Sequence, residues 1–353
     1  MSDPTVSIIM ATYNGAALLP ETLASLAAQS FRDWELIAVD DGSRDDTVRV
    51  LRDFGDPRVR VIVSETNNGP VIARNRAFAQ ARGRYIAGLD QDDIALPERF
   101  ARQAAWLDAH PDTVLVSTAA DFLIDGAIEP GNWPRPMPPV LIDWLILIRN
   151  PLVWSSVLFR ADAARRLDPL ARPELRYVED FDLYHRLRPF GRLAQIDEVL
   201  TLYRCHALGA SQVYNGIMRA HGEKLLADRH QALLGEAASE FAALLVRHVM
   251  ACEPVPGREA LERLFTGIAT LRADFEGHGD YSFVELAWVD REISRLWWRL
   301  CRAGIRSGTL QLHHALADRP SAVALGDGRP ADLMVSQLIG GVRAIRRGLG
   351  RAG

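Results

Sequence analysis

Three carboxylates fall within four positions of the sequence LDQDD, directly after an apolar run. They are Asp90, Asp92 and Asp93, and carboxylates this close repel one another unless a positive charge compensates them. Hard divalent cations such as Mg²⁺ and Mn²⁺ prefer oxygen ligands, and Mg²⁺ often uses one or two protein carboxylates together with substrate phosphates. Because alternate residues of an extended chain point to the same side, Asp90 and Asp92 can face one cation. The alternative for so short a motif is a solvated turn in which Asp93 caps the next helix.

Two further stretches carry groups that can bind a ligand. In VDDGS, the Asp41 carboxylate can accept hydrogen bonds from a nucleobase or ribose, or it can cap the following helix. In NNGPVIARN, Gly69 precedes a predicted helix and Arg74 lies within it. These polar groups either lie near a ligand's phosphates or sugar or belong to an ordinary capped helix.

Two later stretches offer proton-transfer and metal-binding groups. VEDFDLYHRL places Glu179, Asp180 and Asp182 at the start of a predicted helix. Asp180 can act as a general base there, or the acids can simply complement the helix dipole. Residues two apart do not share a helix face, so Asp182 points away from Asp180. In LYRCHALGAS, His206 stands at the end of a predicted strand. It is either a metal or phosphate contact or an ordinary surface histidine.

Alternating strands and helices must position these residues. Apolar, β-branched runs predict strands, and amphipathic stretches bounded by Pro or Gly predict helices. The predicted strands are 6–13, 34–43, 58–65 and 84–90, and the helices between them are 20–30, 45–55 and 69–83. Such alternation implies a parallel sheet covered on both faces, with ligands bound beyond the carboxyl ends of its strands. Tyr13, Asp41 and the LDQDD residues are therefore expected to meet at one edge.

The rest of the chain is less regular. We expect a strand at 113–123, a Pro-rich loop at 129–139, a strand and then a helix within 154–167, a helix at 177–191 and a strand at 193–206. Beyond about residue 210 the composition shifts to helical stripes of apolar residues. We therefore predict one domain over 1–212 and a mainly α-helical region over 213–353.

Composition limits the class of protein. The chain has 353 residues, 48% of them hydrophobic and 24% charged, and its net charge is −4. This is the composition of an ordinary globular protein, and it argues against a nucleic-acid partner. Three widely spaced cysteines indicate a reducing compartment, and neither a leader peptide nor a membrane-spanning run is visible. We therefore expect a cytoplasmic protein.

Taken together and in order, these motifs resemble those of the family 2 glycosyltransferases, which have the GT-A fold. The matching stretches are SIIMATYNG, LASLAAQSFRDWELIAVDDGSRDDT, NNGPVIARNRAFAQARGRYIAGLDQDDIALPERF, VEDFDLYHRL and LYRCH, within residues 5 to about 212. The resemblance implies a Rossmann-like nucleotide-binding mixed sheet with flanking helices. It also implies an inverting glycosyltransferase that uses a nucleotide-sugar donor, with UDP as the expected nucleotide, and Mn²⁺ or Mg²⁺.

Carried onto this sequence, the resemblance places Tyr13 against the base, Asp41 on the base and Arg74 near the donor. Asp90 would lie by the ribose or metal, Asp92 would bind the metal, and His206 would add a metal or phosphate contact. Asp180 would be the catalytic base. Ala11 and Cys205 depart from the usual family pattern, where a hydroxyl residue and an aliphatic residue are common. These two departures bear on the details of the donor site and not on the assignment to this class of enzyme.

The acceptor is expected to be a glycan, a lipid-linked sugar or a protein, in synthesis of a bacterial surface polysaccharide, lipopolysaccharide or glycoprotein glycan. Two alternatives are a non-catalytic partner-binding protein with the same fold and a sugar-phosphate nucleotidyltransferase. The C-terminal helices would place the acceptor, join two copies or touch the inner membrane. The basic tail, with Arg343, Arg346, Arg347 and Arg351, fits an amphipathic membrane helix or a packed helix with a frayed end.

Overall fold

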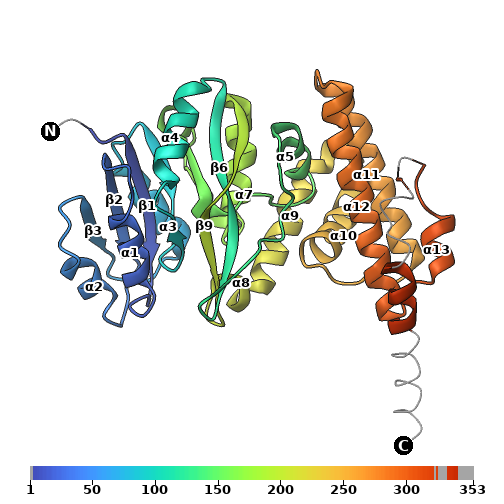
Figure 1. The fold of residues 1–353 in the computed structure, drawn as a ribbon, viewed down its shortest axis with the longest axis horizontal. Helices are drawn as coiled ribbons and strands as arrows, with labels where there is room; N and C mark the ends of the chain where they lie inside the picture. The colour runs from blue at the N-terminus through green and yellow to red at the C-terminus, as the bar shows by residue number, and fades with distance from the viewer. Residues whose placement is uncertain (1–2, 322, 325–331, 341–353) are drawn as a thin grey trace, which may run out of the picture. The chain divides into compact units, whose positions relative to one another are not determined.

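The chain forms two compact units, which are described separately. The computed structural model describes residues 3–321, 323–324 and 332–340 (Figure 1). The first unit comprises residues 1–142 and 150–221, and the second comprises residues 143–149 and 222–353. The predicted boundary near residue 212 precedes helix α9 (Asn215–Leu234), within which the first unit gives way to the second.

The first half of the first unit is the predicted parallel sheet. Strands β1 (Val6–Thr12), β2 (Trp34–Asp40), β3 (Val59–Val63) and β4 (Tyr85–Gly88) pair in the order β3-β2-β1-β4, all parallel. β2 is buried along its whole length, and β1 almost so, as expected for strands covered on both faces. This arrangement confirms the expectation from the alternating pattern.

Helices connect these strands and pack against the sheet. They are α1 (Leu19–Ala27), α2 (Thr47–Asp53) and α3 (Pro70–Ala79), and α4 (Arg99–Ala109) follows further along the chain. Leu19, Leu23 and Leu26 of α1 recur at helical spacing and are fully buried against the sheet. Pro70 begins α3, where a missing backbone N–H costs nothing. The three helices predicted at 20–30, 45–55 and 69–83 are confirmed with bounds that differ by one to four residues, whereas α4 was not predicted.

The second half makes the sheet mixed. Strand β8 (Val157–Arg160) runs antiparallel to β4 and to β6 (Thr113–Ile124), and β6 runs parallel to β9 (Arg192–Cys205). Strand β5 (Ile94–Ala95) pairs antiparallel with β9, and β7 (Ala127–Glu129) forms a hairpin with β6. The β5–β9 pairing fixes the LDQDD loop beside the end of β9. The remaining segments of this unit are η1 (Trp154–Ser156), α6 (Ala161–Ala164), η2 (Pro173–Leu175), α7 (Glu179–Leu187), η3 (Arg188–Phe190) and α8 (Ala210–Val213).

The second unit is helical, as expected. It contains the end of α9, then η4 (Gly235–Ala237), α10 (Ala238–Leu244), η5 (Leu245–Met250), α11 (Arg258–His278), α12 (Phe283–Ser307) and α13 (Leu312–Ala317). Ser282 and Glu285 form a capping box at the start of α12, and Gly308 ends that helix with φ of 79°.

A short segment far back in the sequence also belongs to the second unit. Residues 143–149 include the end of helix α5 (Pro139–Leu145), and the Trp144 ring lies edge-on to Phe275 at 5.7 Å. His230 Nε2 lies 2.7 Å from the Leu147 carbonyl oxygen. Within the described part of the chain, no helix has the length and apolarity needed to cross a bilayer. The arginines of the predicted basic tail, residues 343–351, lie outside the described residues.

Candidate active site

The LDQDD loop is attached to the end of β9 by several hydrogen bonds. The Arg204 backbone N–H donates to Asp93 Oδ1 at 2.8 Å, and Arg204 Nε donates to the Asp92 carbonyl oxygen at 2.8 Å. His206 Nε2 lies 2.8 Å from Asp92 Oδ2. Asp92 and His206, predicted from separate motifs, are therefore brought into direct contact.

The three carboxylates of this loop differ in role. Burial, and then the negative charge of Asp90, raises the pKa of Asp92. Asp93 is only 1% exposed, and burial together with its two acidic neighbours raises its pKa well above the usual range. Asp93 ties the loop to β9 and does not cap α4, so the helix-cap alternative for this residue is wrong.

Arg74 joins the LDQDD loop to the start of α7. Its Nη2 donates to Asp90 Oδ1 at 2.6 Å, and its Nη1 forms an ion pair with Glu179. The guanidinium also lies over the Trp154 ring, 5.0 Å from its centroid. Burial lowers the pKa of Arg74, but the two carboxylates raise it by more, so the side chain stays a cation. A contact between Arg74 and a donor stays a prediction, because these contacts already occupy much of its guanidinium.

Tyr13 follows the carboxyl end of β1 and is 40% exposed. Gln91, the middle residue of the LDQDD loop, holds the Tyr13 backbone: Tyr13 N–H donates to Gln91 Oε1 at 2.9 Å, and Gln91 Nε2 donates to the Tyr13 carbonyl at 3.1 Å. A Cβ on Gly15 would lie 2.2 Å from Gln91 Oε1, so this contact needs glycine there. An exposed ring on a fixed backbone is able to stack on a flat ligand.

Asp41 is 2% exposed and receives two backbone hydrogen bonds. Asn68 N–H donates to Oδ1 at 2.9 Å, and Gly69 N–H donates to Oδ2 at 2.7 Å. The carboxylate thereby fixes the loop before α3, where Gly69 has φ of 90°. Each carboxylate oxygen can accept a further bond. Base recognition by Asp41 therefore stays a prediction alongside this structural role.

Asp180 is the second residue of helix α7, and its environment differs from those of its acidic neighbours. Phe181 N–H donates to its Oδ1 at 2.7 Å, and Asn150 Nδ2 donates to its Oδ2 at 2.8 Å. Burial, and then the negative charge of Glu179, raises the pKa of Asp180 to about 7. Asp182 is 1% exposed and forms ion pairs with Arg172 and Arg186. Among the described residues, Asp180 forms no ion pair with an arginine, and the nearby Arg74 charge lowers its pKa by less than burial and Glu179 raise it.

Sequence reasoning missed the segment 150–156, which lies against both acidic motifs. Asn150 binds Asp180, Trp154 lies beneath Arg74, and Ser155 Oγ accepts a 2.9 Å hydrogen bond from the Asp90 N–H. A Cβ on Gly88 would lie 2.6 Å from the Trp154 ring. The sequence signals only a strand in this region, because these contacts join residues far apart in the chain.

The metal-ligating side chains at this site suit a divalent cation, but they do not complete its coordination shell by themselves. Asp92 and His206 offer an oxygen and a nitrogen side by side, which suits Mn²⁺ or Mg²⁺ when substrate phosphates complete the shell. Asp90 Oδ1 is bound to Arg74. Among the described residues, no group of three or more His, Cys, Asp or Glu side chains converges as a complete metal site.

Sequence comparisons show which known proteins the chain is similar to. Residues 7–166 match the family described as Glycosyl transferase family 2. EpsE of Bacillus subtilis (strain 168), provisionally named a glycosyltransferase, is 32% identical over 193 residues, which cover 52% of this chain and 67% of EpsE. The Escherichia coli protein WfgD, named as a UDP-Glc:alpha-D-GlcNAc-diphosphoundecaprenol beta-1,3-glucosyltransferase, is 36% identical over 107 residues, which cover 30% of this chain and 42% of WfgD.

Solved structures show the same fold at low identity. TarS 1-349 of S. aureus, in complex with UDP-GlcNAc, aligns with a TM-score of 0.55 and 20% identity over 98% of this chain and 92% of that one. The mannosyltransferase PcManGT of Pyrobaculum calidifontis, in complex with GDP-Man and Mn²⁺, aligns with a TM-score of 0.51 and 16% identity over 98% and 88%. The mixed sheet is thus of the GT-A type, and the chain belongs to glycosyltransferase family 2.

Proposed function

We propose that this glycosyltransferase transfers a sugar with inversion, from a nucleotide-sugar donor to an acceptor hydroxyl, and that Asp180 is its general base. One observation carries the proposal. Burial and the Glu179 charge raise the pKa of Asp180 to about 7, whereas the neighbouring acids Glu179 and Asp182 form ion pairs with arginines. A base with a pKa near the working pH is best suited to accept a proton during attack.

The donor would occupy the carboxyl edge of β1, β2 and β4. Tyr13 would stack on the nucleobase and Asp41 would accept hydrogen bonds from it, while Asp90 would lie by the ribose or the metal. Asp92 and His206 would hold Mn²⁺ or Mg²⁺. A bound divalent cation stabilises the negative charge that develops on a leaving nucleoside diphosphate. A UDP-linked donor is supported by the WfgD name and by the complex of TarS with UDP-GlcNAc, and a metal by the Mn²⁺ complex of PcManGT.

The transfer step follows from the position of the base. As the acceptor oxygen bonds to the anomeric carbon, its proton passes to the Asp180 carboxylate and the bond to the diphosphate breaks. A single displacement of this kind inverts the anomeric carbon and needs no covalent intermediate, as in inverting glycoside hydrolases. Asn150 and the Phe181 N–H fix the carboxylate in place.

The acceptor class is proposed from the relatives. WfgD is named for a diphosphoundecaprenol-linked sugar, and ExoO of Rhizobium meliloti for succinoglycan biosynthesis. We propose a glycan or lipid-linked acceptor in synthesis of a bacterial surface polysaccharide. Membrane contact and self-association through the C-terminal helices stay predictions.

The test is a screen of nucleotide sugars by release of nucleoside diphosphate, with and without EDTA, on the wild type and Asp92→Ala. We expect turnover with one donor, loss of turnover in EDTA with recovery on excess Mn²⁺, and little turnover with Asp92→Ala. Release of pyrophosphate instead would indicate a nucleotidyltransferase. Donor binding with no turnover in the presence of any acceptor would favour the non-catalytic alternative. Full activity in EDTA would refute the metal role.

A further inference from the structure

The first turn of helix α12 presents two large apolar side chains to water. Phe283 is 87% exposed and Val284 is 69% exposed. Helices α11 and α12 lie side by side (Figure 1), with the Phe265 ring edge-on to the Trp297 ring at a centroid distance of 4.7 Å. The core between these helices does not use Phe283 and Val284. Adjoining exposed apolar side chains of this kind mark a surface that contacts a partner or a membrane.

The turn that carries these two side chains is held by its own packing. The Tyr281 ring stacks on the Phe275 ring, with the centroids 4.5 Å apart. The Ser282 N–H donates to Glu285 Oε2 at 2.9 Å, and the Glu285 N–H donates to Ser282 Oγ at 3.3 Å, which completes the capping box. Phe283 therefore follows a fixed helix start, and its exposure is a property of the folded turn.

Basic side chains continue along the exposed side of α12. Residues three or four positions apart share a helix face, and this spacing joins Val284 to Trp288, Arg291, Arg295, Arg299 and Arg302. Arg291 and Arg295 are exposed, and the Arg291 guanidinium lies 5.3 Å from the centroid of the half-buried Trp288 ring. The N-terminal part of this face thus combines apolar groups with two arginines that are open to solvent.

The acidic side chains of α12 lie off this face and already have partners. One closes the capping box, and Asp290 pairs with Arg272 of α11 at 2.7 Å. Glu292 is 14% exposed and pairs with Arg149 at 3.7 Å and with Arg295 at 3.8 Å. The pair with Arg295 is long and partly solvated, so it neutralises the arginine only weakly. The face therefore stays cationic.

We propose that Phe283, Val284, Trp288, Arg291 and Arg295, together called the α12 surface, dock on an anionic lipid membrane. Apolar side chains insert at the headgroup boundary, tryptophan prefers that boundary, and arginines attract anionic headgroups. The chain has a net charge of −4, so anionic lipids attract it only through a local basic surface. The choice of a membrane as the partner rests on the lipid-linked acceptor proposed above, because an acceptor on a lipid carrier lies in such a layer.

The test measures binding of the whole chain to sedimented vesicles, without donor, acceptor or metal. The vesicles are phosphatidylcholine alone, or phosphatidylcholine with phosphatidylglycerol as the anionic lipid. We expect at least fivefold stronger partition to the anionic vesicles, weakening as salt is raised. Phe283→Ser with Val284→Ser, and separately Arg291→Glu with Arg295→Glu, should each lower that partition at least fivefold. Asp280→Asn, which removes an exposed acid from the preceding turn, should raise it.

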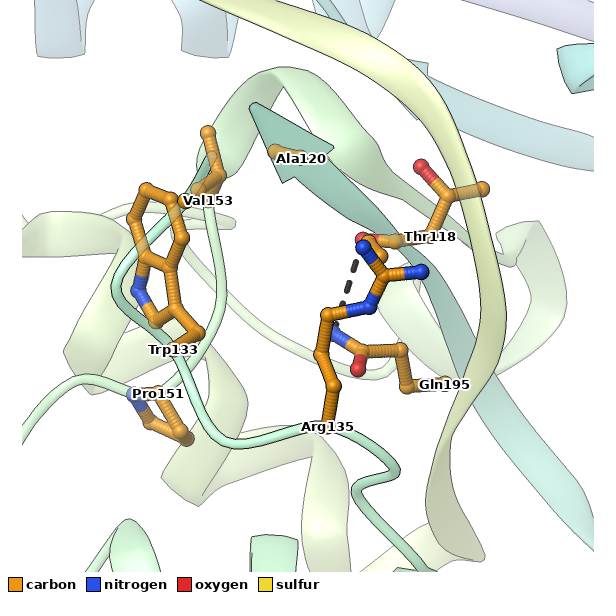
Figure 2. Close-up of a pocket in the computed structure, with 9 residues that line it drawn as sticks. Thr118, Ala120, Trp133, Arg135, Pro151, Val153 and Gln195 are labelled. Carbon is orange, nitrogen blue, oxygen red and sulfur yellow. Dashed lines mark hydrogen bonds between the residues drawn. The ribbon is translucent and has the colours of Figure 1, made fainter. Parts of the chain in front are cut away.

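The matched charge control is Arg84→Glu with Arg135→Glu. Both are exposed arginines of the first unit, and Arg135 borders the small hollow shown in Figure 2. This variant has the same change in net charge as the α12 arginine variant, and it should bind anionic vesicles within twofold of the wild type. Thermal melting checks that every variant is folded.

The α12 surface is refuted as a membrane contact if anionic vesicles do not bind the wild type, if neutral vesicles bind it equally well, or if either α12 double variant binds like the wild type. Removal of residues 341–353 separates the contribution of the basic tail. Binding that persists and still depends on Phe283 and Val284 supports the α12 surface, whereas loss of all binding refutes it and assigns the contact to the tail.

Two further measurements separate this docking from other functions of the chain. Sedimentation velocity without lipid tests self-association: a dimer that Phe283→Ser with Val284→Ser abolishes, together with no vesicle binding, would make this surface a contact between copies and refute the membrane. Transfer to a water-soluble acceptor should be unchanged in both α12 variants. Failure of the proposed transfer and failure of membrane docking are therefore separate results.

Discussion

Asp180 and its neighbours show how three acids in one short motif acquire different protonation behaviour. Glu179 and Asp182 face arginines, while Asp180 is partly buried beside the Glu179 charge. The sequence correctly places all three in the first turn of a helix and predicts that Asp182 points elsewhere. It could not supply Arg74 and Arg172, which come from other segments, whereas Arg186 stands four residues after Asp182 in the same motif.

The transfer rate should rise with pH around neutrality. A base acts only when it is ionised, and with a pKa of about 7 the ionised fraction of Asp180 grows as pH increases from 6 to 8. We expect the acceptor-dependent rate to increase over this range and then level off. Asp180→Asn keeps size and hydrogen bonding but cannot take the proton, so it should lower the rate about 10²–10⁴-fold. Stopped-time transfer assays from pH 5.5 to 8.5 measure both effects.

Donor binding supplies the control for that prediction. Calorimetry should give nearly the same donor affinity for Asp180→Asn as for the wild type. A near wild-type rate in Asp180→Asn would place the base elsewhere, and a collapse of donor binding would move Asp180 to the donor site.

Arg74 should contribute strongly to stability because it neutralises Asp90 and Glu179. Arg74→Met leaves two carboxylates unpaired, and removal of one partner from a buried pair costs about 3–5 kcal/mol. Asp90 is partly exposed, so solvent screening lowers its share, and we expect about 3 kcal/mol in urea unfolding. Adding Glu179→Gln should recover part of the loss.

At the scale of elements, close approach between β4 and the 150–156 segment positions both acidic motifs. A Cβ on Gly88 would lie 2.6 Å from both the ring and the carbonyl oxygen of Trp154. Overpacking of this kind typically costs about 1–3 kcal/mol. Gly88→Ala should therefore lower the melting temperature and also displace Asn150 and Ser155, with at least a tenfold loss of turnover. Gly216→Ala is the matched control, because a Cβ there meets nothing within 4 Å.

The local sequence pattern was sufficient to predict the parallel half of the sheet, but it was not sufficient to predict the mixed half. Each strand–helix–strand step from β1 to β4 is a local unit, so alternation and turn residues predict it. The pairing of Val116 with both Leu158 and Ala194 joins distant segments, and no local periodicity records it. The contact of Asn150 with Asp180 depends on that pairing, which is why it was not predicted.

At the scale of the whole molecule, the chain does not divide at a single point. Residues 143–149 belong to the second unit although residues on both sides of them belong to the first. Within the second unit, Trp144, Leu145, Ile146 and Ile148 are all buried, and Arg149 pairs with Glu292 at 3.7 Å. A boundary near residue 212 predicted from composition could not include this segment, because it is too short to change the local composition.

A chain shortened to residues 1–221 should therefore fold poorly, although it keeps every motif of the proposed active site. It would expose the apolar side chains of 143–149 to water, and a large exposed apolar patch favours aggregation. We expect size-exclusion chromatography to show aggregates that bind the dye ANS. The same shortened chain with Trp144→Ser, Leu145→Ser and Ile148→Ser should be more monomeric, because the exposed patch is smaller. If the unmodified 1–221 chain is instead monomeric and melts like the whole protein, the second unit is not needed to cover this segment.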